Sequence, residues 1–63
     1  MIRPHQIAQT IAQQFPERSL DRYDQIWEIK KALIASGSEI LATDRETIDS
    51  ILDILFTEFK FKP

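Results

Sequence analysis

The sequence predicts an all-α fold, a small three-helix bundle that runs up, down and up. Apolar residues recur at intervals of three and four, the spacing that places them on one face of a helix. The single glycine, Gly37, and two prolines, Pro4 and Pro16, stand at the expected helix boundaries. Two short connections separate three such segments, and helices joined by short connections run antiparallel. We therefore expect helices at roughly 4–15, 19–36 and 43–60.

The size of the chain makes self-association one expected source of stability. Sixty-three residues form one domain, 1–63, and a domain of this size buries only about 60% of the surface that its unfolded chain exposes. The sequence has no cysteine and one histidine, so disulfides and sites of several thiolates or imidazoles are excluded. A second chain or an unusually well-packed core remains as the additional source of stability.

The first helix, 4–15, is predicted to cover the bundle with a narrow apolar face. Between Pro4 and Phe15 there is no charged residue. Because interface cores are depleted in charge, the opposite face is a candidate docking surface. The alternative is an ordinary exposed helix that is rich in glutamine, a good helix former. The apolar face holds Ile7, Ala8, Ile11, Ala12 and Phe15, and the polar face holds Gln6, Gln9, Thr10 and Gln13.

The second helix, 19–36, is expected to begin with Ser19 as its N-cap and to end before Gly37. Its apolar residues cover close to half of the helix circumference, which is more than one neighbouring helix needs. We expect Trp27 to be buried in the middle of this arc, with Tyr23 nearer its edge as a candidate partner contact. The arc contains Leu20, Tyr23, Ile26, Trp27, Ile29, Leu33 and Ile34.

The third helix, 43–60, is expected to form the main hairpin with the second. Thr43 and Glu46 have the spacing of a capping box. The main apolar stripe consists of Ile48, Ile51, Leu52, Leu55, Phe56 and Phe59. Seven residues apart, Ile54 and Phe61 are predicted to form a second strip that faces a partner. In the alternative, the helix ends near Phe59 and Phe61 folds back, or residues 59–63 are extended.

The connection between these two helices contains two apolar residues, Ile40 and Leu41. We expect them to plug one end of the bundle, because apolar loop residues in small folds tend to pack on the core. The alternative is an exposed docking knob.

Few residues could support chemistry. His5 stands alone in the sequence, without a second group that would activate or orient it. Asp49 and Asp53 are four apart on a helix and could hold a cation, although a hydrated acidic face explains them as well. A single glycine excludes a glycine-rich phosphate loop. We expect no enzyme, no metal and no cofactor.

The charge balance argues against nucleic acid and membranes as partners. The net charge is −2, and no apolar run reaches the roughly 20 residues of a membrane span. A helix-turn-helix regulator is the alternative, but its recognition helix at 43–60 would be acidic. With no recognisable signal peptide or lipidation motif, the cytoplasm is the expected location.

The leading functional hypothesis is a small soluble protein–protein interaction module, since the two longer helices carry more apolar surface than one copy should hide. Another copy of the chain is the expected partner, and a different protein is the alternative. The candidate interface residues are Tyr23, Ile54, Phe61, Gln6, Gln9 and Gln13.

Overall fold

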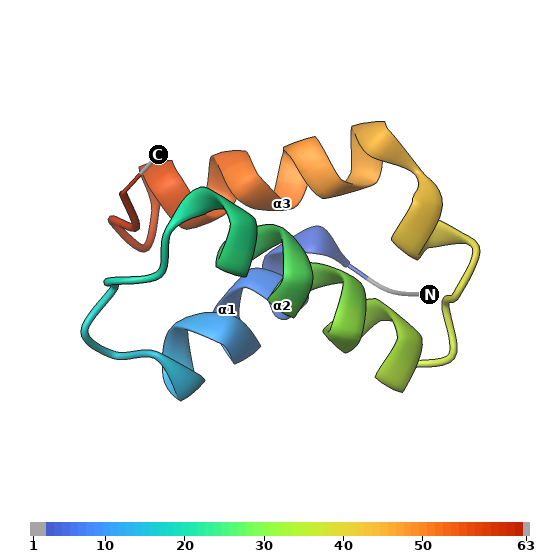
Figure 1. The fold of residues 1–63 in the computed structure, drawn as a ribbon, viewed down its shortest axis with the longest axis horizontal. Coiled ribbons are helices and arrows are strands. Elements are labelled where there is room, and N and C mark those ends of the chain that lie inside the picture. The colour runs from blue at the N-terminus through green and yellow to red at the C-terminus, as the bar shows by residue number, and fades with distance from the viewer. Residues whose placement is uncertain (1–2, 63) are drawn as a thin grey trace.

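A computed structural model describes residues 3–62; Met1, Ile2 and Pro63 lie outside the described residues. Within that range the chain forms three α-helices, no β-strand and one short 3₁₀ helix. Successive α-helices run in opposite directions, as Figure 1 shows, which confirms the predicted three-helix fold. The elements are α1 (Pro4–Gln14), α2 (Arg22–Ala35), η1 (Leu41–Thr43) and α3 (Arg45–Thr57).

Helix α1 begins at Pro4, whose missing N–H is no loss at the first helical position. It ends at Gln14, because Phe15 precedes Pro16 and leaves helical geometry. The predicted apolar face is buried in the core, while Phe15 is half-buried at its edge. The buried residues of α1 are Ile7, Ala8, Ile11 and Ala12.

Helix α2 begins three residues later than predicted, and Ser19 is not its N-cap. The cap is Asp21, whose carboxylate accepts a hydrogen bond of 2.8 Å from the backbone N–H of Asp24. The chain between the two helices turns at Arg18, which has a left-handed φ of 58°. Residues 19–21, which the apolar pattern assigns to the second helix, therefore precede α2.

Helix α2 ends just before Gly37, as the sequence predicts. Gly37 has a φ of 80°, the N–H of Ser38 donates to Leu33, and the N–H of Gly37 donates to Ile34. This pair of bonds is a Schellman motif, which closes a helix with a left-handed residue.

The α2–α3 connection packs differently from the predicted plug. Ile40 is 85% exposed, so only Leu41 of the predicted pair lies against the core. Thr43 ends η1 and donates its hydroxyl to the Ile40 carbonyl rather than capping α3. The N-cap of α3 is Asp44, which accepts from the backbone N–H of Thr47 at 3.2 Å.

Helix α3 ends at Thr57, three residues before the predicted boundary. The chain then turns through Lys60, with a φ of 64°, and Phe61 N–H donates to the Leu55 carbonyl at 2.9 Å. Phe61 is thereby returned to the bundle, where it is 1% exposed. The alternative in which Phe61 folds back is the observed one, and residues 58–62, the C-terminal tail, are neither helix nor strand.

The buried side chains form one cluster to which all three α-helices and the C-terminal tail contribute. Helix α3 packs on both other helices, and its contact with α1 is the more extensive one. The outer side of α2 faces the viewer in Figure 1 and is covered by no other segment there. The candidate site lies on this open side of α2.

Candidate interaction surface

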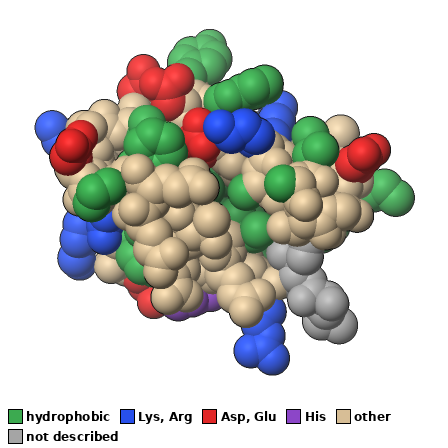
Figure 2. Space-filling view, turned by 90° about the horizontal axis from the view of Figure 1, so that it is seen from below, with side chains coloured by type: hydrophobic (Ala, Val, Ile, Leu, Met, Phe, Trp, Pro, Cys, Tyr) green, Lys and Arg blue, Asp and Glu red, His purple; other side chains and the backbone are tan. Residues whose placement is uncertain are grey.

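Three large apolar side chains line the outer side of α2. Tyr23 is 87% exposed, Trp27 is 62% exposed and Ile34 is 51% exposed. At 3.6 residues per turn, their spacings of four and seven residues place them within about 40° of one another around the helix axis. We call these three residues the α2 stripe. Figure 2 shows hydrophobic side chains that protrude at the edge of the molecule, beside charged groups of both signs.

Beside the stripe lies a hollow of about 380 Å³ between α2 and the η1 segment. Trp27 and Ile34 line it from α2, and Ala42 and Thr43 line it from η1. We call it the α2–η1 hollow; its lining consists of Trp27, Lys30, Lys31, Ile34, Glu39, Ala42 and Thr43. The lining of the hollow is mostly apolar, and its two lysines come from α2.

The prediction that Trp27 is buried is wrong. Residues two apart on a helix are rotated by about 200°, so Trp27 and Ile29 point to nearly opposite sides of α2. Ile29 and Leu33 are fully buried, and they fix which side of the helix faces the core. Apolar residues do cover about half of the circumference of α2. Only the part of this arc that contains Ile29 and Leu33 packs against the core.

Of the three apolar residues among the predicted partner contacts, Tyr23 is the one that the structure leaves most open to solvent. Phe61 is buried within its own chain, because α3 stops at Thr57 and never carries Phe61 to the face of Ile54. Ile54 is half-buried and packs on the core, so the two residues form no free apolar strip. Trp27, Ile34 and Phe56 are exposed, although the sequence prediction assigned them to apolar faces that pack inside the bundle. For Ile40, the alternative of an exposed position is the observed one.

The polar face of α1 is exposed, as predicted, and lies apart from the α2 stripe. Gln6, Gln9 and Gln13 all point to solvent, and Figure 2 shows a broad area of this side of the molecule without charged side chains. Their side chains form no hydrogen bond within the described residues. The glutamine face lies on α1 and the stripe lies on α2, so the two surfaces share no residue.

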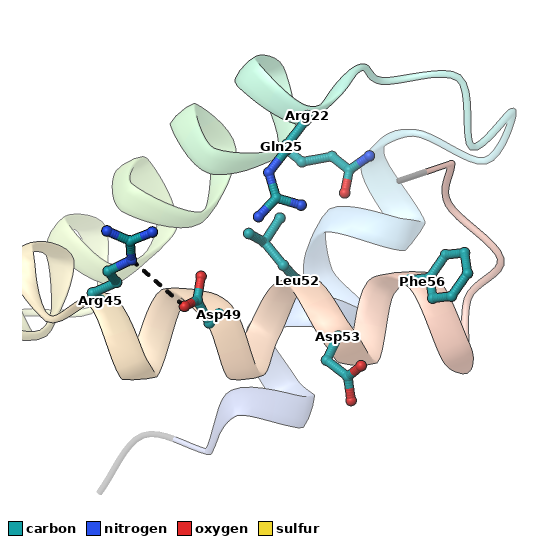
Figure 3. A pocket seen from close by; sticks show the side chains of 7 residues that line it. All are labelled: Arg22, Gln25, Arg45, Asp49, Leu52, Asp53 and Phe56. Carbon is teal, nitrogen blue, oxygen red and sulfur yellow. Dashed lines mark ion pairs between the residues drawn. The ribbon is translucent and has the colours of Figure 1, made fainter.

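The two acidic residues of interest lie at a second hollow, of about 260 Å³, between α2 and α3 (Figure 3). Arg45 Nε lies 3.8 Å from Asp49 Oδ2, across one turn of α3. Arg22 comes from the opposite wall, and Asp53 completes a set of two positive and two negative groups. Because these charges balance, the hollow favours neither a cation nor an anion.

His5 is no longer isolated once the chain is folded. Its Nε2 atom lies 3.2 Å from Glu58 Oε1, and its ring lies 5.6 Å from the ring of Phe59, centroid to centroid. These contacts join the start of α1 to the C-terminal tail on an exposed surface. Neither of these two hollows includes His5 in its lining.

Within residues 3–62, no three His, Cys, Asp or Glu side chains gather closely enough to hold a metal ion. Among the helices described there, none has the length and apolar content needed to cross a bilayer. Comparison of the chain with protein-family models, with curated proteins and with solved structures gave no match.

Proposed function

We propose that this chain is a small cytosolic protein–protein interaction module that self-associates through the α2 stripe. The observation that carries the proposal is the exposure of Tyr23, Trp27 and Ile34 along one line of a helix whose other side is fully buried. Aromatic residues are the commonest anchors of protein interfaces. In this proposal the chain acts by binding and not by catalysis, and the lack of cysteine suits a reducing compartment.

The available apolar area supports a pairwise interface. A buried aromatic side chain covers about 150–250 Å². The α2 stripe, together with the apolar lining of the adjoining α2–η1 hollow, therefore offers on the order of 500 Å² per chain. Two such surfaces facing each other bury on the order of 1,000 Å² in total, the range in which specific interfaces begin. A chain of this size gains stability from such a partner.

The experiment is a measurement of molar mass by light scattering over a wide range of dilution. We expect twice the chain mass of 7.4 kDa at micromolar concentration and dissociation on dilution. A double variant, Tyr23→Ser with Trp27→Ser, is expected to remain folded and to have the single-chain mass, because both side chains lie outside the core.

The matched control is Phe56→Ser, which removes a 50% exposed aromatic residue from α3 and not from the stripe. It is expected to keep the mass of the native chain. A native mass near 7.4 kDa at every concentration contradicts the proposal, as does a stripe variant that associates like the native chain.

The rival hypothesis is a helix-turn-helix-like regulator that binds nucleic acid. Helix α3 would be its recognition helix, but it carries one basic residue, Arg45, against Glu46, Asp49 and Asp53. Such a helix repels phosphates and releases few counterions. Salt-sensitive retention on heparin supports the rival, whereas elution with the unbound fraction at low salt supports an interaction module.

A further inference from the structure

We infer that the occupant of the α2–η1 hollow is Tyr23 of a second copy, so that two α2 helices pack antiparallel about a two-fold axis. This inference rests on the proposed function and specifies its geometry. A dimer with two-fold symmetry uses the same patch on both chains and must be self-complementary. The knob and the hole must therefore both be present on one copy, on opposite sides of the axis.

The knob is Tyr23, the most exposed large apolar residue in the described chain at 87%. The hole is the α2–η1 hollow, whose lining includes Ile34. We place the two-fold axis at the middle of the stripe, between Glu28 and Ile29. Each α2 residue of one copy then lies opposite an α2 residue of the other copy, and the residue numbers of such a pair add up to 57. Tyr23 of one copy then stands opposite Ile34 of the other, at the mouth of the hollow.

The same register places Trp27 opposite Lys30 of the second copy. Lys30 is exposed and lines the hollow beside Trp27. An ammonium group over an indole face is attracted by the ring quadrupole, and the lysine stem adds apolar contact. One symmetric register thus gives each exposed group of the stripe a partner of suitable chemistry.

The charges along one edge of the stripe favour the same arrangement. Asp24 and Lys31 are seven residues apart, so they share one side of α2. In an antiparallel pair, that side of one helix meets the same side of the other. Asp24 then lies within about two residues, or roughly 3 Å along the axis, of Lys31 in the second copy. Each dimer contains two such contacts.

Both groups are available for these contacts. Asp24 is exposed, and its carboxylate takes no hydrogen bond within residues 3–62. Lys31 Nζ lies 3.2 Å from Glu28 of its own chain, but an ammonium group has three donors. Charge complementarity at an interface rim fixes register more than it adds affinity.

The test measures the self-association of two charge-reversal variants, Lys31→Glu and Asp24→Lys. Each variant is measured alone and then in an equimolar mixture with the other. Each alone is expected to weaken self-association about tenfold, because two attractive contacts per dimer become repulsive. In a mixed pair both contacts again join opposite charges. We therefore expect the mixture to form a heterodimer with the affinity of the native chain, measured by sedimentation of one labelled variant.

Chemical cross-linking provides a second measurement that does not depend on the charge variants. The native chain has no cysteine, so a single introduced thiol reports one position. Lys30→Cys lies close to the proposed axis and is expected to cross-link through a short bis-maleimide reagent. Ser50→Cys, exposed on α3, is the matched control and is expected to remain single-chain.

The outcomes separate this inference from the proposed function. A native chain that stays monomeric removes both. A dimer that the stripe variant dissociates, but that charge reversal and mixing leave unchanged, keeps the proposed function and overturns the antiparallel register. Equal cross-linking at positions 30 and 50 also overturns it.

Discussion

At the scale of single residues, Arg18 joins parts of the chain that are distant in sequence. Its Nε donates to the Phe59 carbonyl at 2.8 Å, and its Nη1 donates to the carbonyls of Ala12 and Phe15 at 2.7 and 3.3 Å. The guanidinium carbon also lies 5.5 Å from the centre of the Phe61 ring. One planar cation thus satisfies carbonyls at the end of α1 and holds the C-terminal tail against them.

Gln25 plays a similar part from α2. Its side chain is 2% exposed, and its amide nitrogen donates to the carbonyls of Leu20 and Lys62 at 2.9 and 2.6 Å. The sequence could not identify Gln25 or Arg18 as structural residues, because their partners Lys62 and Phe59 are 37 and 41 positions away. Local periodicity carries no information about such distant pairs.

We predict that Arg18→Lys lowers the free energy of unfolding by about 1.5–3 kcal/mol, since a single ammonium cannot reach carbonyls on both sides of the guanidinium fork. The measurement is chemical denaturation followed by circular dichroism. Arg22→Lys is the control, because Arg22 is exposed and lies outside these contacts. Equal midpoints for the Arg18 variant and the native chain would show that the contacts contribute little.

At the scale of elements, the sequence predicts where helices exist better than where they begin. The sequence prediction names Ser19 and Thr43 as caps, and an aspartate follows each of them within one turn. In both cases the aspartate is the observed cap. The choice depends on the path of the preceding turn: Arg18 adopts a left-handed φ before α2, and Thr43 belongs to η1. Helix periodicity does not specify either turn.

Helix α2 shows the same limit for its apolar arc. The sequence prediction centres the arc on Trp27, whereas the buried apolar residues of the helix are Ile29 and Leu33. A contact for the exposed half of the arc stays a prediction. The candidate site was therefore found in part, through Tyr23. A helical wheel fixes relative directions, whereas only packing against α1 and α3 decides which direction is inward.

For the α3 cap we predict that Asp44→Ala lowers the free energy of unfolding by about 1 kcal/mol. This loss corresponds to about 4–8 °C in Tm for a domain of this size, measured by thermal denaturation. The variant loses the acceptor for the Thr47 N–H. Asp44→Asn keeps an acceptor and should recover most of the loss. Asp53→Ala, an exposed change on the same helix, should melt like the native chain.

At the scale of the whole molecule, the core is completed by the C-terminal tail. Phe61 is among the largest fully buried side chains, although it lies outside every helix. The predicted fold class and helix order are confirmed. The place of Phe61 could not be settled from the sequence, because a helix that continued to residue 60 and one that ended at Thr57 fit the same apolar pattern.

We predict that Phe61→Ala abolishes cooperative folding at 37 °C. Truncating a buried phenylalanine costs about 3–5 kcal/mol, which is as much as a core of this size supplies. Phe56→Ala removes a half-exposed phenylalanine of the same size and is expected to keep a sharp thermal transition. The measurement is the thermal transition by circular dichroism. A cooperative transition for the Phe61 variant close to that of the native chain would contradict this account of the core.

The outward position of Trp27 has one more consequence. It is the only tryptophan in the chain and is 62% exposed, so its intrinsic fluorescence acts as an unlabelled optical reporter of the α2 surface. Covering the indole shifts its emission to shorter wavelength, whereas unfolding an isolated copy changes the emission little, because the ring already meets water. The spectrum of the native chain therefore distinguishes occupation of this surface from loss of structure.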